Sequence, residues 1–124
     1  ISMVSLRTFP IRVGNVGEAS SGPIYRDQQE LSWDAVADIS GIKGLTETTT
    51  VTKRTRRVFT FSQLQLDRML KFVRPTHAFL NFVNYLGDKR ESFVTGIKHR
   101  LESQGCRLAL LGTGEAFDDM ESLI

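Results

Sequence analysis

In the second half of the chain, apolar residues first recur with a helical period and then form a nearly continuous run. Apolar side chains recur at i, i+3, i+4 and i+7 over residues 66–73, after Ser62, which is a good helix N-cap. Pro75 cannot continue that helix. The mostly apolar run 78–85 is typical of a strand buried in a parallel sheet.

The same order of elements is then repeated. A second helix is predicted from Asp88, as its N-cap, to Gly105, and a second buried strand over 107–111. Alternating helices and strands at this spacing predict an α/β fold with a parallel sheet. In such sheets ligands bind beyond the carboxyl ends of the strands, here 84–87 and 112–114. Ordinary turns between strand and helix are the alternative interpretation of both places.

The first half of the chain is less periodic. Residues 3–9 predict a strand that Pro10 ends, and 11–15 continue it towards a loop rich in glycine over 14–23. Ser32 is the expected N-cap of a short helix. Because the chain opens directly in a strand-like run, we expect it to be a piece of a longer polypeptide.

Composition restricts the class of protein only weakly. The 124 residues contain 40% hydrophobic and 24% charged residues with a net charge of +2, as in one ordinary globular domain. This charge balance demands neither nucleic acid nor a membrane surface as a partner. The single cysteine, Cys106, rules out an internal disulfide, suits a reducing cytoplasm and is expected to be a buried structural thiol.

The segment 46–57 carries the clearest chemistry. It contains several threonines, one carboxylate and four cations, namely Lys53, Arg54, Arg56 and Arg57. Guanidinium groups grip carboxylates and phosphates with two parallel hydrogen bonds, and threonine hydroxyls add short donors, so the segment suits a small, multiply charged anion. A solvated, β-rich turn and a nucleic-acid-binding module acting through Lys53 to Arg57 are the alternatives.

Five segments, taken together and in order, resemble the C-terminal part of adenylosuccinate synthetase. Members of that family carry T-R-V-G, a G-P loop, T-T-x-G-R-x-R-R, T-K-x-D at a strand end and a final S-T-G. The corresponding segments here are 11–14, 22–23, 50–57, 81–84 and 112–114. The resemblance implies that residues 1–124 are the C-terminal part of a mostly parallel-sheet synthetase domain with a P-loop NTPase-like fold.

The family is a C–N bond-forming ligase. It transfers the γ-phosphate of a nucleoside triphosphate to O6 of a purine monophosphate, and the amine of L-aspartate then displaces that phosphate. By resemblance, the aspartate-binding residues are Thr50, Val51, Thr52, Lys53, Arg54, Thr55 and Arg56. The monophosphate would be bound by Val13, Gly14 and Arg54. The triphosphate would be bound by Arg56, Asn81, Phe82, Asn84, Gly112, Thr113 and Gly114.

Several residues depart from the family pattern. Phe82 and Asn84 replace the lysine and aspartate of T-K-x-D, Lys53 replaces a glycine, and Gly112 replaces a serine. An amide both donates and accepts, which suits adenine better than guanine, so we expect ATP or dATP as the phosphate donor. These departures resemble the phage branch that joins aspartate to dGMP, and equally some archaeal-type synthetases, and this segment does not separate the two. An ordinary enzyme using IMP and GTP is the alternative.

The resemblance also implies what this segment lacks. The family's Gly-rich phosphate loop, catalytic aspartate and catalytic histidine have no counterpart here, and His77 and His99 are expected to be structural. We therefore expect the segment alone to be inactive, with Mg²⁺ bound mainly outside it. The intact enzyme is expected to be a cytoplasmic homodimer, in the host cytoplasm if phage-encoded, and to bind neither membrane nor nucleic acid. A degenerate remnant that only oligomerises is a third alternative.

Overall fold

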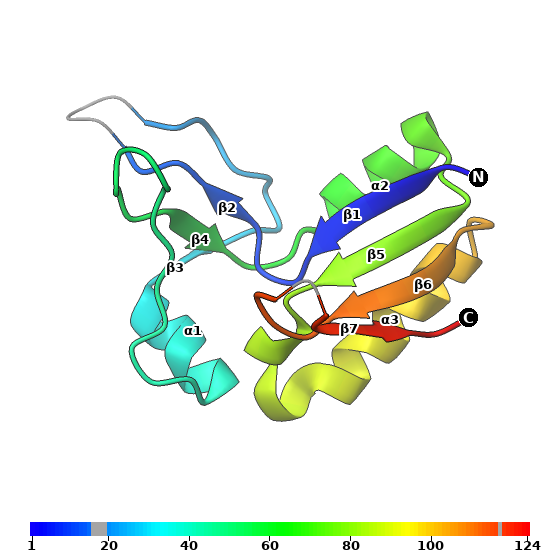
Figure 1. Ribbon diagram of the computed structural model, residues 1–124. Helices are drawn as coiled ribbons and strands as arrows, with labels where there is room; N and C mark the ends of the chain where they lie inside the picture. Colours follow the sequence, from blue (N-terminus) through cyan, green and yellow to red (C-terminus); the bar gives the residue numbers. More distant parts are fainter. Residues whose placement is uncertain (16–19, 117) are drawn as a thin grey trace.

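A mostly parallel sheet with helices on one face forms the larger part of the molecule (Figure 1). The computed structural model describes residues 1–15, 20–116 and 118–124. The sheet has the strand order β1 (Met3–Arg7), β5 (His77–Asn81), β6 (Arg107–Gly112), β7 (Met120–Ser122). The first three strands are mutually parallel and β7 is antiparallel. The predicted α/β class is confirmed, whereas β7 was not predicted because its three residues are all exposed.

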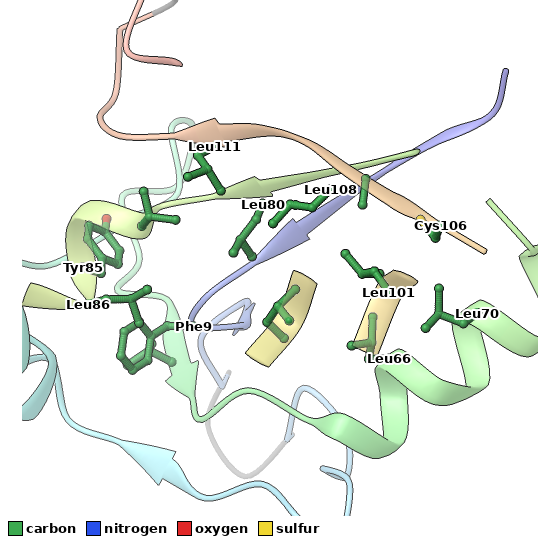
Figure 2. Packing of buried hydrophobic residues seen from close by; sticks show 14 of the residues in the cluster. Phe9, Leu66, Leu70, Leu80, Tyr85, Leu86, Leu101, Cys106, Leu108 and Leu111 are labelled. Carbon is green, nitrogen blue, oxygen red and sulfur yellow. The ribbon is translucent and has the colours of Figure 1, made fainter. Parts of the chain in front are cut away.

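The two helices α2 (Gln63–Val73) and α3 (Arg90–Glu102) lie behind the sheet in Figure 1. Their apolar residues meet alternate strand residues in one continuous core, shown in Figure 2. The buried members include Leu66, Leu70, Leu80, Ile97, Leu101 and Leu108. Each fully buried side chain of this size contributes about 1.5–3 kcal/mol. The helical period predicted over 66–73 therefore marks the face that packs on the sheet.

Two of the three predicted N-caps, Ser62 and Ser32, are present. Ser62 accepts a hydrogen bond from the Gln65 N–H at 3.0 Å at the start of α2. Ser32 does the same for the Ala35 N–H at 3.1 Å at the start of α1 (Trp33–Ser40). These bonds satisfy N–H groups that have no partner inside the helix.

A second, antiparallel sheet joins three short strands in the order β2 (Ile11–Arg12), β4 (Arg57–Phe59), β3 (Glu30–Leu31). The expectation that 11–15 simply continue the first strand is therefore wrong. Pro10 has no N–H for the first sheet, and its carbonyl instead accepts from the Phe59 N–H at 2.9 Å, which directs the chain into the second sheet. Residues 16–19 of the predicted glycine-rich loop lie outside the described residues.

Two predicted boundaries at the carboxyl side of the sheet are corrected. The apolar run does not stay extended to residue 85, because Phe82 takes a left-handed φ of 62° and starts the 3-10 turn η1 (Val83–Tyr85). A second such turn, η2 (Gly87–Lys89), then contains Asp88. The N-cap of α3 is Lys89, without a side-chain cap, so Asp88 does not have the predicted role.

The single cysteine lies in the core. Cys106 is 1% exposed, and burial raises the pKa of its thiol, as expected of a structural cysteine. Across the described part of the chain, no helix has the length and apolar character needed to cross a bilayer.

Candidate functional site

The threonine- and arginine-rich segment forms a hairpin rather than an irregular loop. Thr48 pairs with Thr55 in an antiparallel bridge, and the Arg56 N–H donates to the Glu47 carbonyl at 2.8 Å. At the tip, the Thr49 N–H donates to the Arg54 carbonyl at 2.8 Å. We call residues 47–56 the anion hairpin. Its backbone is therefore held by its own hydrogen bonds before any ligand is present.

The backbone at Lys53 shows why the family has a glycine at this position. Its φ is 57°, in the left-handed region that glycine adopts without strain and side chains avoid. The family's glycine at this position thus meets a backbone requirement of the hairpin. Here a lysine accepts that conformation and adds a cation next to Arg54 at the exposed tip.

Two predicted groups of ligand residues lie side by side. A Cβ on Gly14 would meet the Thr55 carbonyl oxygen at 2.7 Å and the Arg54 Cβ at 3.9 Å, so only glycine allows this approach. The predicted monophosphate residues thus border the predicted aspartate residues. Val13 and Val51, which are 62% and 90% exposed, leave this region open to solvent.

The base of the anion hairpin contains a cluster of charged and polar groups that we did not predict. Glu47 Oε2 accepts from Arg7 Nη2 at 2.5 Å and from the Tyr85 hydroxyl at 3.0 Å. Glu47 Oε1 accepts from Arg56 Nη1 at 3.2 Å. Arg7 ends β1 and Tyr85 follows β5, so Glu47 ties the hairpin to the carboxyl ends of two neighbouring strands. Burial and the Glu47 carboxylate raise the pKa of the Tyr85 hydroxyl well above its usual range.

Phe82 lies next to this cluster. The guanidinium carbon of Arg7 is 4.0 Å from the Phe82 ring centroid, and the Tyr85 ring centroid is 4.9 Å from it. The Thr8 hydroxyl donates to the Phe82 carbonyl at 2.8 Å. The aromatic ring at the family's lysine position is therefore fixed in place and adjoins the groups that hold the anion hairpin.

The two predicted strand ends meet at Asn81 and Gly112. The Asn81 Oδ1 accepts from the Phe82 N–H at 2.9 Å, which supports the left-handed turn. A Cβ on Gly112 would lie 2.0 Å from that oxygen, so the carboxamide occupies the space that a serine would need. Gly112 and Asn81, which both depart from the family pattern, are thus a packing pair.

The turn after β6 is closed by a residue that sequence reasoning missed. Thr113 N–H donates to the Asp119 carbonyl at 2.8 Å, and the Ala116 N–H donates to Asp119 Oδ2 at 3.0 Å. A Cβ on Gly114 would meet the same carboxylate oxygen at 2.3 Å. Asp119 therefore folds 112–114 back on itself.

Asn84 carries an unusual feature. Among the described residues its Oδ1 is buried and has no hydrogen-bond partner. A buried acceptor left in this state costs about 1–3 kcal/mol. Because protein atoms shield this oxygen, a ligand N–H would reach it only after the carboxamide turned over.

The structure divides the predicted cation cluster. Arg57 forms an ion pair with Glu30 at 2.9 Å and stacks 5.0 Å from the Phe59 ring centroid, and Arg56 is paired with Glu47. The Arg57 hydrogen bonds also lower the pKa of the Glu30 carboxyl. Among the residues that the structure describes, only Lys53 and Arg54 of the cluster lack a carboxylate partner, which disfavours the nucleic-acid alternative.

Within residues 1–15, 20–116 and 118–124, no three His, Cys, Asp or Glu side chains come together in a way that could hold a metal ion.

Comparison with known proteins finds phage synthases that are similar in sequence to this chain. No family model matches the chain. The N6-succino-2-amino-2'-deoxyadenylate synthase of Acinetobacter phage SH-Ab 15497 is 35% identical over 136 residues, covering 100% of the chain and 33% of the relative. The synthase of Vibrio phage phiVC8 is 38% identical, covering 93% of the chain and 32% of that protein.

This chain is a homologue of part of these phage synthases. A solved synthetase from Cyanophage S-2L, bound to dGMP and to dATP as an energy donor, matches with a TM-score of 0.75 and 35% identity. The match covers 94% of the chain and 31% of that structure. The resemblance inferred from the sequence and the synthetase-like fold are both confirmed. The chain spans about a third of the length of the phage synthases that it matches.

Proposed function

We propose that these 124 residues are the C-terminal part of an enzyme that joins L-aspartate to a purine deoxynucleotide monophosphate, with dGMP favoured. The observation that carries the proposal is 35% to 45% identity to four phage synthases of that kind. The anion hairpin suits the two carboxylates of aspartate and the phosphoryl charge of the intermediate. Its exposed tip bears Lys53 and Arg54, with Gly14 alongside for the monophosphate.

The roles of the chain's own residues follow from that placement. Thr50 to Arg56 would bind aspartate, with Arg54 also reaching the monophosphate and Arg56 the triphosphate. A hairpin that closes over the substrates would exclude water from a phosphorylated intermediate. Arg54→Ala should lower kcat/KM at least about 100-fold, since both anions lose a forked ligand. Arg68→Ala, which removes an exposed cation of α2, is the matched control and should change little.

The phosphate donor is the second part of the proposal. We propose ATP or dATP, because Asn84 stands where the family's guanine-binding aspartate would be and its Oδ1 lacks a partner among the described residues. With the carboxamide turned so that its oxygen faces the ligand, it would accept from the exocyclic amine of adenine. The triphosphate base would lie near Phe82, with Asn81 and 112–114 at the neighbouring strand ends. Asn84→Asp should then shift preference towards GTP, and an unaltered ATP/GTP ratio would contradict this assignment.

The third part of the proposal concerns the metal ion, assembly and location of the intact enzyme. We propose that Mg²⁺ accompanies the triphosphate and is held outside these residues, that the enzyme is a homodimer, and that it works in the host cytoplasm. The 124-residue chain is expected to be inactive alone, because it corresponds to about a third of the phage synthases.

The deciding experiment uses the gene product that contains these residues. IMP, GMP and dGMP are each combined with ATP, dATP and GTP in the presence of Mg²⁺ and L-aspartate, and the succinylated product is followed by mass. Turnover with dGMP and an adenine triphosphate supports the proposal. Turnover restricted to IMP and GTP identifies an ordinary adenylosuccinate synthetase and overturns the assignments of Phe82 and Asn84. The isolated 124-residue chain in the same assay tests whether the rest of the gene product is needed for activity.

A further inference from the structure

Glu47 is the one carboxylate of the threonine- and arginine-rich segment. The ligand-binding roles proposed for the hairpin tip and the strand ends do not involve it. Its side chain is 13% exposed and contacts groups from three separate parts of the chain. These are Arg7 at the end of β1, Tyr85 in η1, and Arg56 on the opposite side of the hairpin. A carboxylate with so little exposure and three donors has its orientation fully determined.

We infer that Glu47 is a positioning residue, which sets the anion hairpin against Phe82 and the turn η1. The inference rests on the proposed function, because it assigns the hairpin to aspartate and phosphate. Glu47 and Phe82 share Arg7, whose guanidinium bonds the carboxylate at 2.5 Å and covers the aromatic ring at 4.0 Å. One side chain therefore links the group that would hold the anions to the ring that would border the triphosphate base.

Glu47 holds Arg7 more firmly than Arg56. This difference indicates that Arg56 is the partner that responds to a ligand. Arg7 is held twice, by Glu47 and through its Nε by the Phe9 carbonyl at 3.0 Å. Arg56 reaches Glu47 through a single 3.2 Å bond and its side chain is 31% exposed. An incoming phosphate would therefore bind the Arg56 side chain and leave Arg7 and Tyr85 in place. Glu47 would thus remain fixed while it holds Arg56 near the site.

Charge supports the same assignment. Without the carboxylate, two arginines would face each other beside a neutral phenol, and Arg56 would turn towards solvent. Glu47→Gln keeps the shape and removes only the charge. Glu30→Gln is the matched control, because it removes the carboxylate partner of Arg57 on the adjoining strand and touches neither Arg7 nor Arg56.

The test measures KM and kcat of the active gene product with both variants. Glu47→Gln should raise KM for aspartate and for the triphosphate about tenfold, with a smaller change in kcat. Tyr85→Phe, which removes one of the three bonds, should act in the same direction with a smaller amplitude. Glu30→Gln should leave both KM values within about twofold of the wild type. Unchanged KM values in Glu47→Gln, or equal shifts in Glu30→Gln, would overturn the inference.

A second measurement needs no substrate and separates this inference from the proposed function. In the 124-residue chain, hindered rotation of the guanidinium groups of Arg7 and Arg56 is followed by NMR. Glu47→Gln should free both groups, and Glu30→Gln should free only Arg57. If the freed groups are seen but the gene product makes no succinylated nucleotide, the proposed function fails while the geometry stands. If Arg7 and Arg56 rotate equally fast in wild type and Glu47→Gln, the positioning role itself fails.

Discussion

Gly112→Ser restores the residue of the family's S-T-G motif at a position where this molecule has no room for a side chain. The new Cβ would lie 2.0 Å from Asn81 Oδ1, 2.9 Å from its Cγ and 3.2 Å from its Cα. The carboxamide must therefore swing away, and the Phe82 N–H loses the acceptor that now lies at 2.9 Å. The left-handed turn at Phe82 would then be unsupported.

The cost follows from two terms. Overpacking a well-filled site costs about 1–3 kcal/mol, and losing the hydrogen bond to Asn81 adds about 1 kcal/mol. We expect the free energy of unfolding to fall by about 2–4 kcal/mol and Tm by roughly 10 °C. Gly96→Ser, on a helix position with no atom within 4 Å of an added Cβ, should stay within about 0.5 kcal/mol of the wild type.

Urea unfolding of the 124-residue chain, followed by the fluorescence of its single tryptophan, measures these changes. Trp33 is suitable because its indole N–H donates to the Arg56 carbonyl at 2.8 Å and will leave that site on unfolding. Asn81→Thr, the other half of the family pattern, should recover about 1–2 kcal/mol when combined with Gly112→Ser. A cost of Gly112→Ser below about 0.5 kcal/mol, or one that Asn81→Thr does not reduce, would refute the packing pair.

Three further outcomes are expected. Lys53→Gly should raise the free energy of unfolding by up to about 1 kcal/mol, since it removes a side chain at φ 57°; a loss of stability in urea unfolding would contradict the left-handed conformation. Ser62→Ala should cost about 1–2 kcal/mol and speed hydrogen exchange at the Gln65 amide, because α2 loses its N-cap. Hydrogen bonds from Arg100 lower the pKa of the Asp67 carboxyl, so its stabilising effect is present above its unfolded pKa of about 3.9 and is lost as the pH falls through the folded value. Asp67→Asn should therefore reduce the drop in Tm between about pH 5 and pH 2, and an unchanged drop would rule out this ion pair as a cause.

Local signals in the sequence predicted helix α2 and two of the helix caps. The caps Ser32 and Ser62 each correspond to a hydrogen bond made within a few residues, and the helical period over 66–73 marks the face of α2 that packs on the sheet. The sequence also placed both candidate ligand sites at the carboxyl ends of parallel strands, and such ends share one edge of a sheet. Asn81 and Gly112 do touch there.

Contacts that depend on the fold could not be predicted in this way. Strands β2 and β3 contain two residues each, which is too short for any alternation to be recognised. Glu47 bonds Arg7 and Tyr85 across separations of 40 and 38 residues, and only the assembled fold brings them together. A lone carboxylate among cations was the available signal for Glu47, but the pattern did not say which cations it would meet.

The departures from the family motifs have physical causes that the motifs themselves do not state. Lys53 occupies a left-handed position, Phe82 occupies another, and Gly112 yields space to Asn81. A bulky residue at positive φ costs of order 1–3 kcal/mol and persists only when its surroundings determine it. For Phe82 those surroundings are visible: its N–H donates to Asn81 Oδ1, its carbonyl accepts from the Thr8 hydroxyl, and the guanidinium of Arg7 covers its ring. For Lys53 the hairpin supplies the backbone bonds, and the proposed anionic ligands supply a reason to keep a cation where a glycine would be more stable. Lys53 therefore lies at the hairpin tip, and Phe82 lies beside Arg7, which bonds Glu47 at the base of the hairpin.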